Sequence, residues 1–285
     1  FPLVCPDPFY SLYGNTAFPE AKLHPATGVA RHPWIEKQNA LMDTEASFTD
    51  EDERRRAFIA YYGLVSWLDN NIGKIVAKLD ETGLRGRTDI IYSSDHGDNV
   101  GARGLWGKSN LYEESVAIPL IMSGPDIPAG VCDTPVSLLD VSATIPETFG
   151  LSALNKAEGK SLLKICEQPE NKDRVVFSEY HAVGAVSGGF MLRKGRFKLI
   201  HYVGFAPELF DLNTDPEEMT NLAEHQDFSS VRDELYAELK AICDPEAVDG
   251  RAHDDQQALV DGYGGFEIAK TLGARAATPP PELSS

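Results

Sequence analysis

The strongest constraint on how this chain can fold is a long stretch with helical periodicity, followed directly by a short strand-like run. Apolar residues recur every three or four positions from Phe58 to Leu79, and this period predicts one helix over about residues 51–81. Gly83 supplies the expected end of that helix. The β-branched, apolar run Thr88–Ser94 that follows predicts a buried parallel strand. A helix followed by a buried strand indicates an α/β fold.

The segments on either side of this helix and strand differ in character. Residues 1–48 are rich in proline and aromatic residues without a sustained period, which predicts ordered loops with short helices. The apolar run Val116–Ser123 predicts a second buried strand, and Asp140–Phe149 predicts a further helix. The chain opens on the apolar, proline-rich Phe1–Pro6. Because independent domains rarely begin in this way, we expect further residues upstream.

Beyond residue 174 the pattern changes to short runs at hairpin spacing, which predict a small antiparallel sheet. The expected strands are Val175–Glu179, Ala185–Arg193, Phe197–Val203 and Glu208–Leu212. An amphipathic pattern then predicts a helix from Val231 to Ile242, and Ala276–Ser285 is typical of a loose tail. We therefore expect two parts. Residues 1–160 would hold a mixed-sheet α/β core, and residues 161–285 a small antiparallel sheet with helices and the tail.

Charge and hydrophobicity exclude two classes of partner. The chain carries 26 Lys and Arg against 44 Asp and Glu, and the formal charge of −18 repels nucleic acid at long range. No apolar run reaches the roughly 18 residues that a membrane-spanning helix needs. The four cysteines show neither a CxxC pair nor a zinc-ligand spacing, so we expect a reducing, cytoplasmic location. A tail after Gly273 could reach a neighbouring subunit, which would make a homo-oligomer.

The turn directly after the first predicted strand carries side chains that can bind a metal ion and an anion. Asp95 and His96 offer a carboxylate and an imidazole at adjacent positions, and the glycines that follow let the backbone approach the same point. Lys108, twelve residues past His96, can bring an ammonium group back toward a metal and an oxyanion. Ligands of α/β sheets bind at the carboxyl ends of strands, which favours a functional site here. The same residues also fit a capped loop that binds nothing.

Several motifs closely resemble the sulfatase family. They are Ser94-Asp95-His96-Gly97, Trp106-Gly107-Lys108, Gly195-Arg196-Phe197-Lys198 and Glu208-Leu209-Phe210-Asp211-Leu212. The resemblance is strong over about residues 50–125 and returns in the last part of the chain, where sulfatases carry a small sheet. It implies the C-terminal part of a sulfatase-type mixed-sheet domain of the alkaline phosphatase superfamily, followed by a small antiparallel sheet with helices. Within the family, the chain resembles bacterial arylsulfatase-like and choline-sulfatase-like enzymes.

This resemblance also implies a chemistry. Sulfatases cleave sulfate esters of small molecules with a formylglycine nucleophile, made from Cys or Ser in C-x-P-S-R or S-x-P-S-R, and with one divalent metal ion. By position, Asp95 and His96 resemble the metal ligands, and Lys108 resembles the catalytic lysine that binds sulfate. Many sulfatases hold calcium. The nitrogen of His96 suits manganese better than calcium, so manganese is the alternative.

The sequence departs from the family pattern in two ways. No cysteine or serine lies in the modification motif, and the early paired aspartates that complete the metal site are absent. We therefore expect the nucleophile upstream of Phe1 and expect these residues alone to be inactive. Asp95 followed by His96 also resembles the phosphonate monoester and phosphodiester hydrolases of the same superfamily. The missing nucleophile leaves a non-catalytic, metal-binding or anion-binding relative as a further alternative.

Other polar residues carry weaker hypotheses. His181 could reach the site from the small sheet and contact substrate, although a lone histidine at a strand end is more often structural. Arg103 and Trp106 could line the substrate entrance, although Trp106 could equally anchor the loop by packing. Glu113 and Glu114 are expected to fix the loop through backbone hydrogen bonds.

Overall fold

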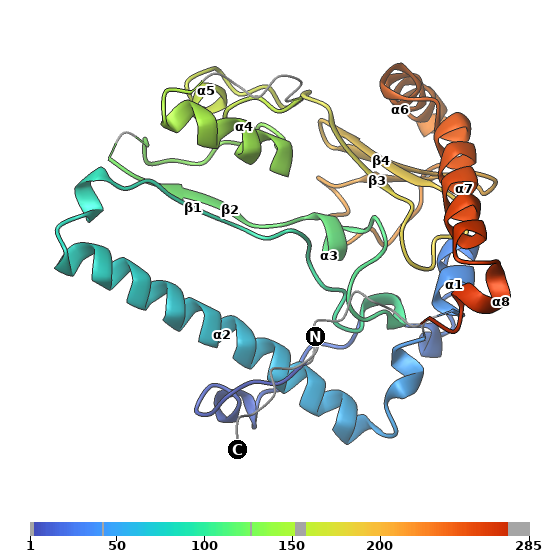
Figure 1. The fold of residues 1–285 in the computed structure, drawn as a ribbon, viewed down its shortest axis with the longest axis horizontal. Helices are drawn as coiled ribbons and strands as arrows, with labels where there is room; N and C mark the ends of the chain where they lie inside the picture. The colour runs from blue at the N-terminus through green and yellow to red at the C-terminus, as the bar shows by residue number, and fades with distance from the viewer. Residues whose placement is uncertain (1–2, 42, 126, 152–157, 273–285) are drawn as a thin grey trace.

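The predicted long helix is present and runs along one side of the molecule (Figure 1). The computed structural model describes residues 3–41, 43–125, 127–151 and 158–272. In it, α2 extends over Glu51–Glu81, which confirms the prediction at both ends. The helix begins after Asp50, whose Oδ1 accepts a 2.7 Å hydrogen bond from the backbone N–H of Glu53. That bond satisfies one of the N–H groups that a first helical turn leaves without an intrahelical partner.

The two strands that flank the candidate site form a separate antiparallel pair. β1 (Ile90–Ser93) and β2 (Leu120–Ser123) are both partly exposed, so the prediction of a buried parallel strand at Thr88–Ser94 is wrong in direction and in burial. Parallel neighbours need a crossover, usually a helix, whereas the connection between these strands has two short helical turns, the 3-10 turn Ala102–Gly104 and the four-residue α3 (Glu113–Val116). β2 also starts later than predicted, because Pro119 has no backbone N–H to donate to a sheet.

Helices cover the β1–β2 pair on both sides. α4 (Leu138–Thr148) confirms the predicted second helix, and together with α5 (Leu162–Cys166) it lies on the side opposite α2 (Figure 1). Asp140 near the start of α4 is fully buried and accepts hydrogen bonds from the Arg174 guanidinium at 2.7 and 2.9 Å. This contact ties α4 to the segment that leads into the second sheet.

The second sheet confirms the predicted run of antiparallel hairpins. Its strands, in spatial order, are β3 (Val176–Tyr180), β4 (Gly189–Lys194), β5 (Phe197–Tyr202) and β6 (Glu208–Asp211). β4 begins four residues later than expected, because the chain from Ala185 to Gly188 is loop. One face of the sheet packs against α6 (Ser229–Ile242), which confirms the predicted amphipathic helix. Leu235 and Leu239 supply the buried helix side of that contact.

Two more helices follow α6 in the last part of the chain. They are α7 (Pro245–Gly262) and α8 (Phe266–Ala269), and neither was predicted individually from the sequence. The predicted loose tail at 276–285, and the subunit contact considered for it, lie outside the described residues. Across the ranges that the structure describes, no helix combines the length and the apolar character needed to cross a membrane.

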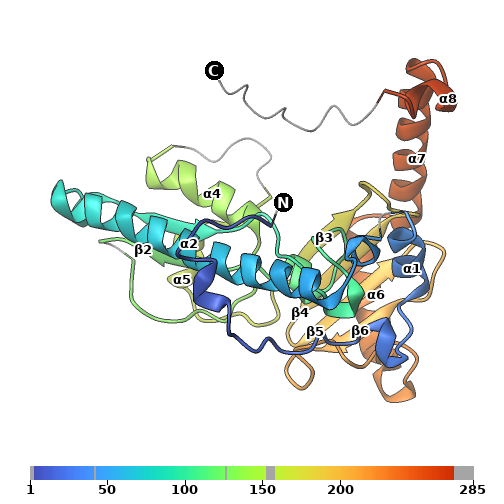
Figure 2. The same cartoon turned by 90° about the horizontal axis from the view of Figure 1, so that it is seen from below.

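The other face of the second sheet packs on segments from the first half of the chain. α1 (Pro33–Asn39) lies beside the sheet (Figure 2), and the Trp34 ring stacks on Tyr202 with 4.9 Å between the ring centroids. Leu105 and Leu111 of the loop after β1 belong to the same buried cluster. This core therefore joins residues on both sides of the boundary expected at 160, and the division into two domains stays a prediction.

Candidate active site

Close backbone packing holds the loop that follows β1. Gly97 lies so near α3 that an added Cβ atom would be 2.0 Å from the carbonyl oxygen of Glu114. Its N–H donates a 2.8 Å hydrogen bond to the carbonyl of Ser115. Ser109 has a φ of 91°, a region that residues with a side chain rarely adopt. Because Gly97 and Ser109 adjoin His96 and Lys108, this packing fixes the backbone next to both predicted site residues.

The structure brings Asp95, His96 and Lys108 together. Nζ of Lys108 lies 2.6 Å from Nε2 of His96, and Oδ2 of Asp95 lies 3.3 Å from the same nitrogen. Nδ1 of His96 lies 2.8 Å from the Gly97 carbonyl oxygen. A carbonyl only accepts, so Nδ1 must carry the proton, and Nε2 presents its lone pair to the ammonium group. This tautomer is the one in which Nε2 can bind a metal ion.

The donor atoms of Asp95 and His96 fit a divalent cation. Two ligands held at roughly 2.0–2.5 Å from one ion lie roughly 3–3.5 Å apart, and the 3.3 Å between Oδ2 and Nε2 falls in that range. The Asp95 side chain is 79% exposed, so it is free to turn toward an ion. Within the residues described here, no group of three or more His, Cys, Asp or Glu side chains is placed to hold a metal. The described residues therefore supply two candidate ligands, where a divalent ion in proteins takes four or more.

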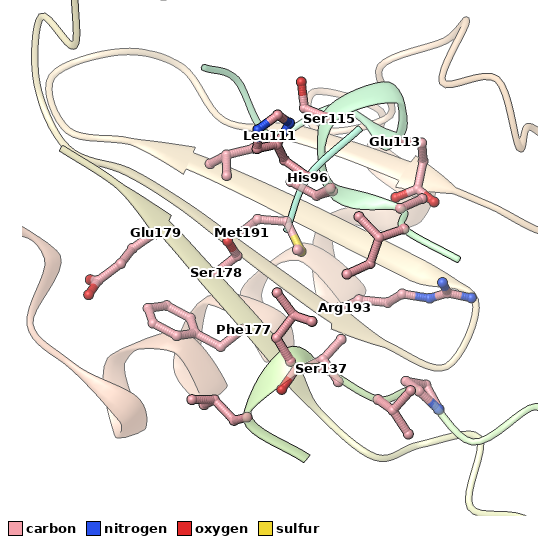
Figure 3. Close-up of a pocket in the computed structure, with 18 of the residues that line it drawn as sticks. His96, Leu111, Glu113, Ser115, Ser137, Phe177, Ser178, Glu179, Met191 and Arg193 are labelled. Atoms are coloured by element: carbon pink, nitrogen blue, oxygen red, sulfur yellow. The ribbon is translucent and has the colours of Figure 1, made fainter. Parts of the chain in front are cut away.

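A large cavity opens beside these three residues. It has a volume of about 1280 Å³, and Asp95, His96 and Lys108 form part of its wall. Figure 3 shows His96 and Glu113 on one side of the cavity, with Phe177 and Arg193 from the second sheet across from them. The cavity therefore lies between the loop after β1 and the strands β3 and β4. A small molecule bound there would touch both parts of the chain.

His181 is placed differently from the other candidate residues. It does not line the cavity, and its ring packs edge-on against Phe190 with 5.2 Å between the centroids. Nε2 of His181 lies 3.4 Å from Oε2 of Glu179. Phe190 belongs to the cluster on the α6 face of the sheet, so the ring is turned toward that face. The predicted contact with substrate stays a prediction without support from this geometry.

Arg103 and Trp106 anchor the loop from inside the protein. Arg103 is 5% exposed and Trp106 is 6% exposed, and neither lines the cavity. The Arg103 guanidinium donates to Glu114 at 3.0 Å and stacks 3.8 Å from the centre of the Tyr112 ring. Glu113 forms a 2.7 Å ion pair with Lys198. Glu113 and Glu114 thus both form side-chain ion pairs. The expected backbone hydrogen bond is present at Glu113, whose N–H donates to Glu218 at 2.8 Å.

Comparison with known families decides what kind of chain this is. Residues 29–151 match the family model described as Sulfatase, and residues 101–244 match the model described as N-sulphoglucosamine sulphohydrolase, C-terminal. The chain belongs to the sulfatase family. The two matches overlap across the loop that carries Lys108, so the family assignment rests on the site as well as on the fold.

Curated members of the sulfatase family match this chain over part of their length. The choline-sulfatase of Rhizobium meliloti (strain 1021) is 36% identical over 178 residues, which cover 61% of this chain and 35% of that protein. The arylsulfatase K of Homo sapiens is 32% identical over 235 residues, which cover 78% of this chain and 43% of that protein. This sulfatase-family chain therefore spans less than half the length of these curated relatives.

Solved structures share the fold of this sulfatase-family chain. The phosphonate monoester hydrolase SpPMH from Silicibacter pomeroyi has a TM-score of 0.73 and 26% sequence identity, over 84% of this chain and 53% of that one. A phosphonate monoester hydrolase of Agrobacterium radiobacter has a TM-score of 0.73 at 23% identity, over 85% and 54% of the two chains. The α/β architecture inferred from the sequence is confirmed, while the sheets of this chain are small and antiparallel.

Proposed function

We propose that the protein containing this chain hydrolyses sulfate esters of small molecules. The observation that carries the proposal is the contact of Lys108 with His96 at the carboxyl end of β1, on the wall of a large cavity in a sulfatase-family chain. A lysine ammonium group beside a metal-binding pair is suited to an anionic ester, because it stabilises negative charge on the sulfate oxygens.

Each site residue has a distinct proposed role. Lys108 would bind a sulfate oxygen and stabilise the charge that develops there as the ester bond breaks. Asp95 and His96 would hold one divalent ion, which polarises the sulfate when it is bound. Calcium is the metal expected from the family, and manganese is the alternative because His96 offers nitrogen. Metal analysis of the purified native protein would distinguish the two ions.

The nucleophile of the proposed reaction is not among these 285 residues. None of the four cysteines lies in C-x-P-S-R, and no serine lies in S-x-P-S-R. The proposal therefore needs a formylglycine from another segment of the gene product. The isolated 285-residue chain is then expected to hydrolyse neither a sulfate nor a phosphonate ester, because charge stabilisation alone leaves only a small part of the rate.

A phosphonate monoester hydrolase is the second candidate function. It is supported by the likeness to the phosphonate monoester hydrolase SpPMH, which is 26% identical to this chain with a TM-score of 0.73. The adjacent Asp95 and His96 also resemble the metal pair of that group. Tetrahedral sulfate and phosphonate esters both place anionic oxygens where Lys108 could bind them, so the fold does not separate the two substrates.

The test compares both ester classes on one protein. The complete gene product would be assayed with 4-nitrophenyl sulfate and with the 4-nitrophenyl ester of phenylphosphonic acid, and its peptides would be weighed for formylglycine. Faster turnover of the sulfate supports the proposal, and faster turnover of the phosphonate supports the second candidate. Turnover of neither ester, with no formylglycine found, would make the protein a non-catalytic anion-binding relative.

A further inference from the structure

A buried lysine on the second sheet contacts α3, the short helix next to the candidate site. Lys198 of β5 is fully buried and lies on the same face of the sheet as Ile200 and Tyr202, toward the loop after β1. Lysine is almost never fully buried unless its charge is paired. The partners of Lys198 therefore show what its burial achieves.

Two carboxylates hold the Lys198 ammonium group. Oε1 of Glu113 and Oε1 of Glu218 each lie 2.7 Å from Nζ. Oε2 of Glu218 also accepts a 2.8 Å hydrogen bond from the backbone N–H of Glu113. Glu218 is itself fully buried and has a φ of 52°, a strained value for a residue with a side chain. Glu113 is thus held twice, once by its carboxylate and once by its backbone.

Glu113 is the first residue of α3, and two hydrogen bonds connect α3 to the imidazole of His96. The carbonyl of Ser115 in α3 accepts the 2.8 Å hydrogen bond from the N–H of Gly97. The carbonyl of Gly97 in turn accepts the hydrogen bond from Nδ1 of His96 at 2.8 Å. The position of α3 therefore sets the position of Gly97, and the Gly97 carbonyl fixes the orientation of the His96 ring.

We propose that Lys198 is a positioning residue of the candidate site, which acts through Glu113, α3 and Gly97 to hold the His96 ring with Nε2 facing Lys108. The inference rests on the proposed roles of His96 and Lys108. The second sheet would then help to position the candidate site, although neither His96 nor Lys108 lies on its strands. Lys198 itself touches no reacting atom.

Stability alone is a weak explanation for a charge cluster in this place. Burying the carboxylate of Glu218 raises its pKa, and the nearby Lys198 opposes that shift. Removing charges from water is costly, and an apolar set of the same volume often stabilises a fold equally well. Ion pairs fix the direction and separation of their groups more narrowly than apolar contacts do. A fixed geometry of this kind is needed if Lys198 is to hold His96 in position through several intervening residues.

The test reads the histidine ring by nuclear magnetic resonance, so it needs no turnover. The full 285-residue chain would be labelled with nitrogen-15 in histidine, and the signals of His96 would be assigned by their loss in His96→Gln. All variants would be compared at one pH. In Lys198→Met we expect both ring signals of His96 to move, because the ring loses its fixed contact with the Gly97 carbonyl.

Matched variants separate positioning from general loosening. Lys194 lies on β4 of the same sheet, between Glu234 and Glu238 at 2.9 and 2.7 Å, and Lys194→Met should leave the His96 signals in place. Leu235→Ala weakens the apolar core on the opposite face of the sheet and should also leave them in place. An unchanged His96 pattern in a folded Lys198→Met protein, or the same change in Leu235→Ala, would overturn the proposal.

A gentler variant covers the case in which Lys198→Met does not fold. Glu113→Ala leaves Lys198 paired with the buried Glu218, and Glu113 is already 22% exposed, so neither buried charge loses its last partner. The His96 signals should shift in the same direction and by a smaller amount. No shift in the folded Glu113→Ala protein would contradict the proposal. If the 285-residue chain shows this coupling and the complete gene product hydrolyses neither ester, only the proposed function is refuted.

Discussion

Glu208 shows how burial changes the chemistry of a single carboxyl group. Its side chain accepts hydrogen bonds from the hydroxyls of Tyr112 and Tyr202 at 2.9–3.1 Å, inside the core that joins the loop to the second sheet. Burial raises the pKa of Glu208 above its ordinary value of 4.5, although both tyrosines oppose the shift. Burial also raises the pKa of each tyrosine, so both remain protonated donors.

This raised pKa predicts a pH-dependent stability. The folded state holds the Glu208 proton at pH values where the unfolded state has lost it, so the free energy of unfolding falls as pH rises from 4.5 through the folded pKa. Each unit between the two pKa values corresponds to about 1.4 kcal/mol. Urea unfolding across this window should show a steeper fall in wild type than in Glu208→Gln, because Glu218, whose pKa burial also raises, titrates in both proteins. The exposed Glu224→Gln should follow wild type, and a parallel fall in Glu208→Gln would count against the assignment.

Lys108 is expected to matter for rate and little for stability. Its side chain is exposed, and His96 is its one polar contact in the described part of the chain. In the complete gene product, Lys108→Ala should lower kcat/KM by roughly 100-fold to 1000-fold, the loss seen when one oxyanion donor is removed. The thermal midpoint should stay close to wild type. Lys74→Ala, an exposed lysine on α2, serves as the control, and an equal loss of midpoint and activity in Lys108→Ala would refute this role.

Element boundaries in this chain follow local chemistry where a cap or a proline is present. α2 begins after Asp50 because the aspartate side chain accepts from the first turn, and β2 begins after Pro119 because proline cannot donate to a sheet. Neither boundary requires a distant partner. A change at such a position should therefore affect its own element first.

The start of α2 gives a direct test at this scale. Asp50→Ala removes the cap and should lower the free energy of unfolding by about 1 kcal/mol. Asp52→Ala removes a carboxylate from the same turn without a capping bond, so it reports only the interaction with the helix dipole. Chemical unfolding of both variants separates the two effects. Equal losses in the two proteins would show that charge, and not the cap, stabilises this end.

The molecule as a whole is held together by contacts between segments far apart in sequence. The cluster around Trp34, Leu111 and Tyr202 joins three such segments, and the pair of Asp140 with Arg174 joins α4 to the entry of β3. These contacts place the loop after β1 against the second sheet, and the cavity beside His96 results from that placement.

Breaking the buried pair should destabilise the whole molecule. Arg174→Met leaves the carboxylate of Asp140 buried without its cation, which typically costs about 3–5 kcal/mol. Lys172→Met removes a lysine only two residues away, whose partners Asp133 and Glu170 are exposed to water, and should change the unfolding midpoint far less. Calorimetry of both variants measures the difference. Similar midpoints for the two would show that the Arg174 pair contributes no more than a surface contact.

The sequence by itself determined the features that depend on local patterns. These features are the apolar period of α2, the hairpin spacing of the second sheet, and the adjacent Asp95 and His96. The structure confirms both the helix and the sheet, and it brings Asp95 and His96 next to Lys108. The antiparallel pairing of β1 with β2 was missed, because a short apolar run has the same appearance in either direction.

Only the tertiary structure decided how the site is supported. Lys198 meets Glu113 across 85 positions of sequence, and the backbone of Glu113 meets Glu218 across 105. No local pattern marks a lysine that will be buried, because its burial depends on carboxylates that other elements bring to it. His181 has the opposite outcome, since its position at a strand end suggested the site while its side chain packs on the α6 face. Local chemistry supplies the reactive groups, and long-range packing decides which of them meet.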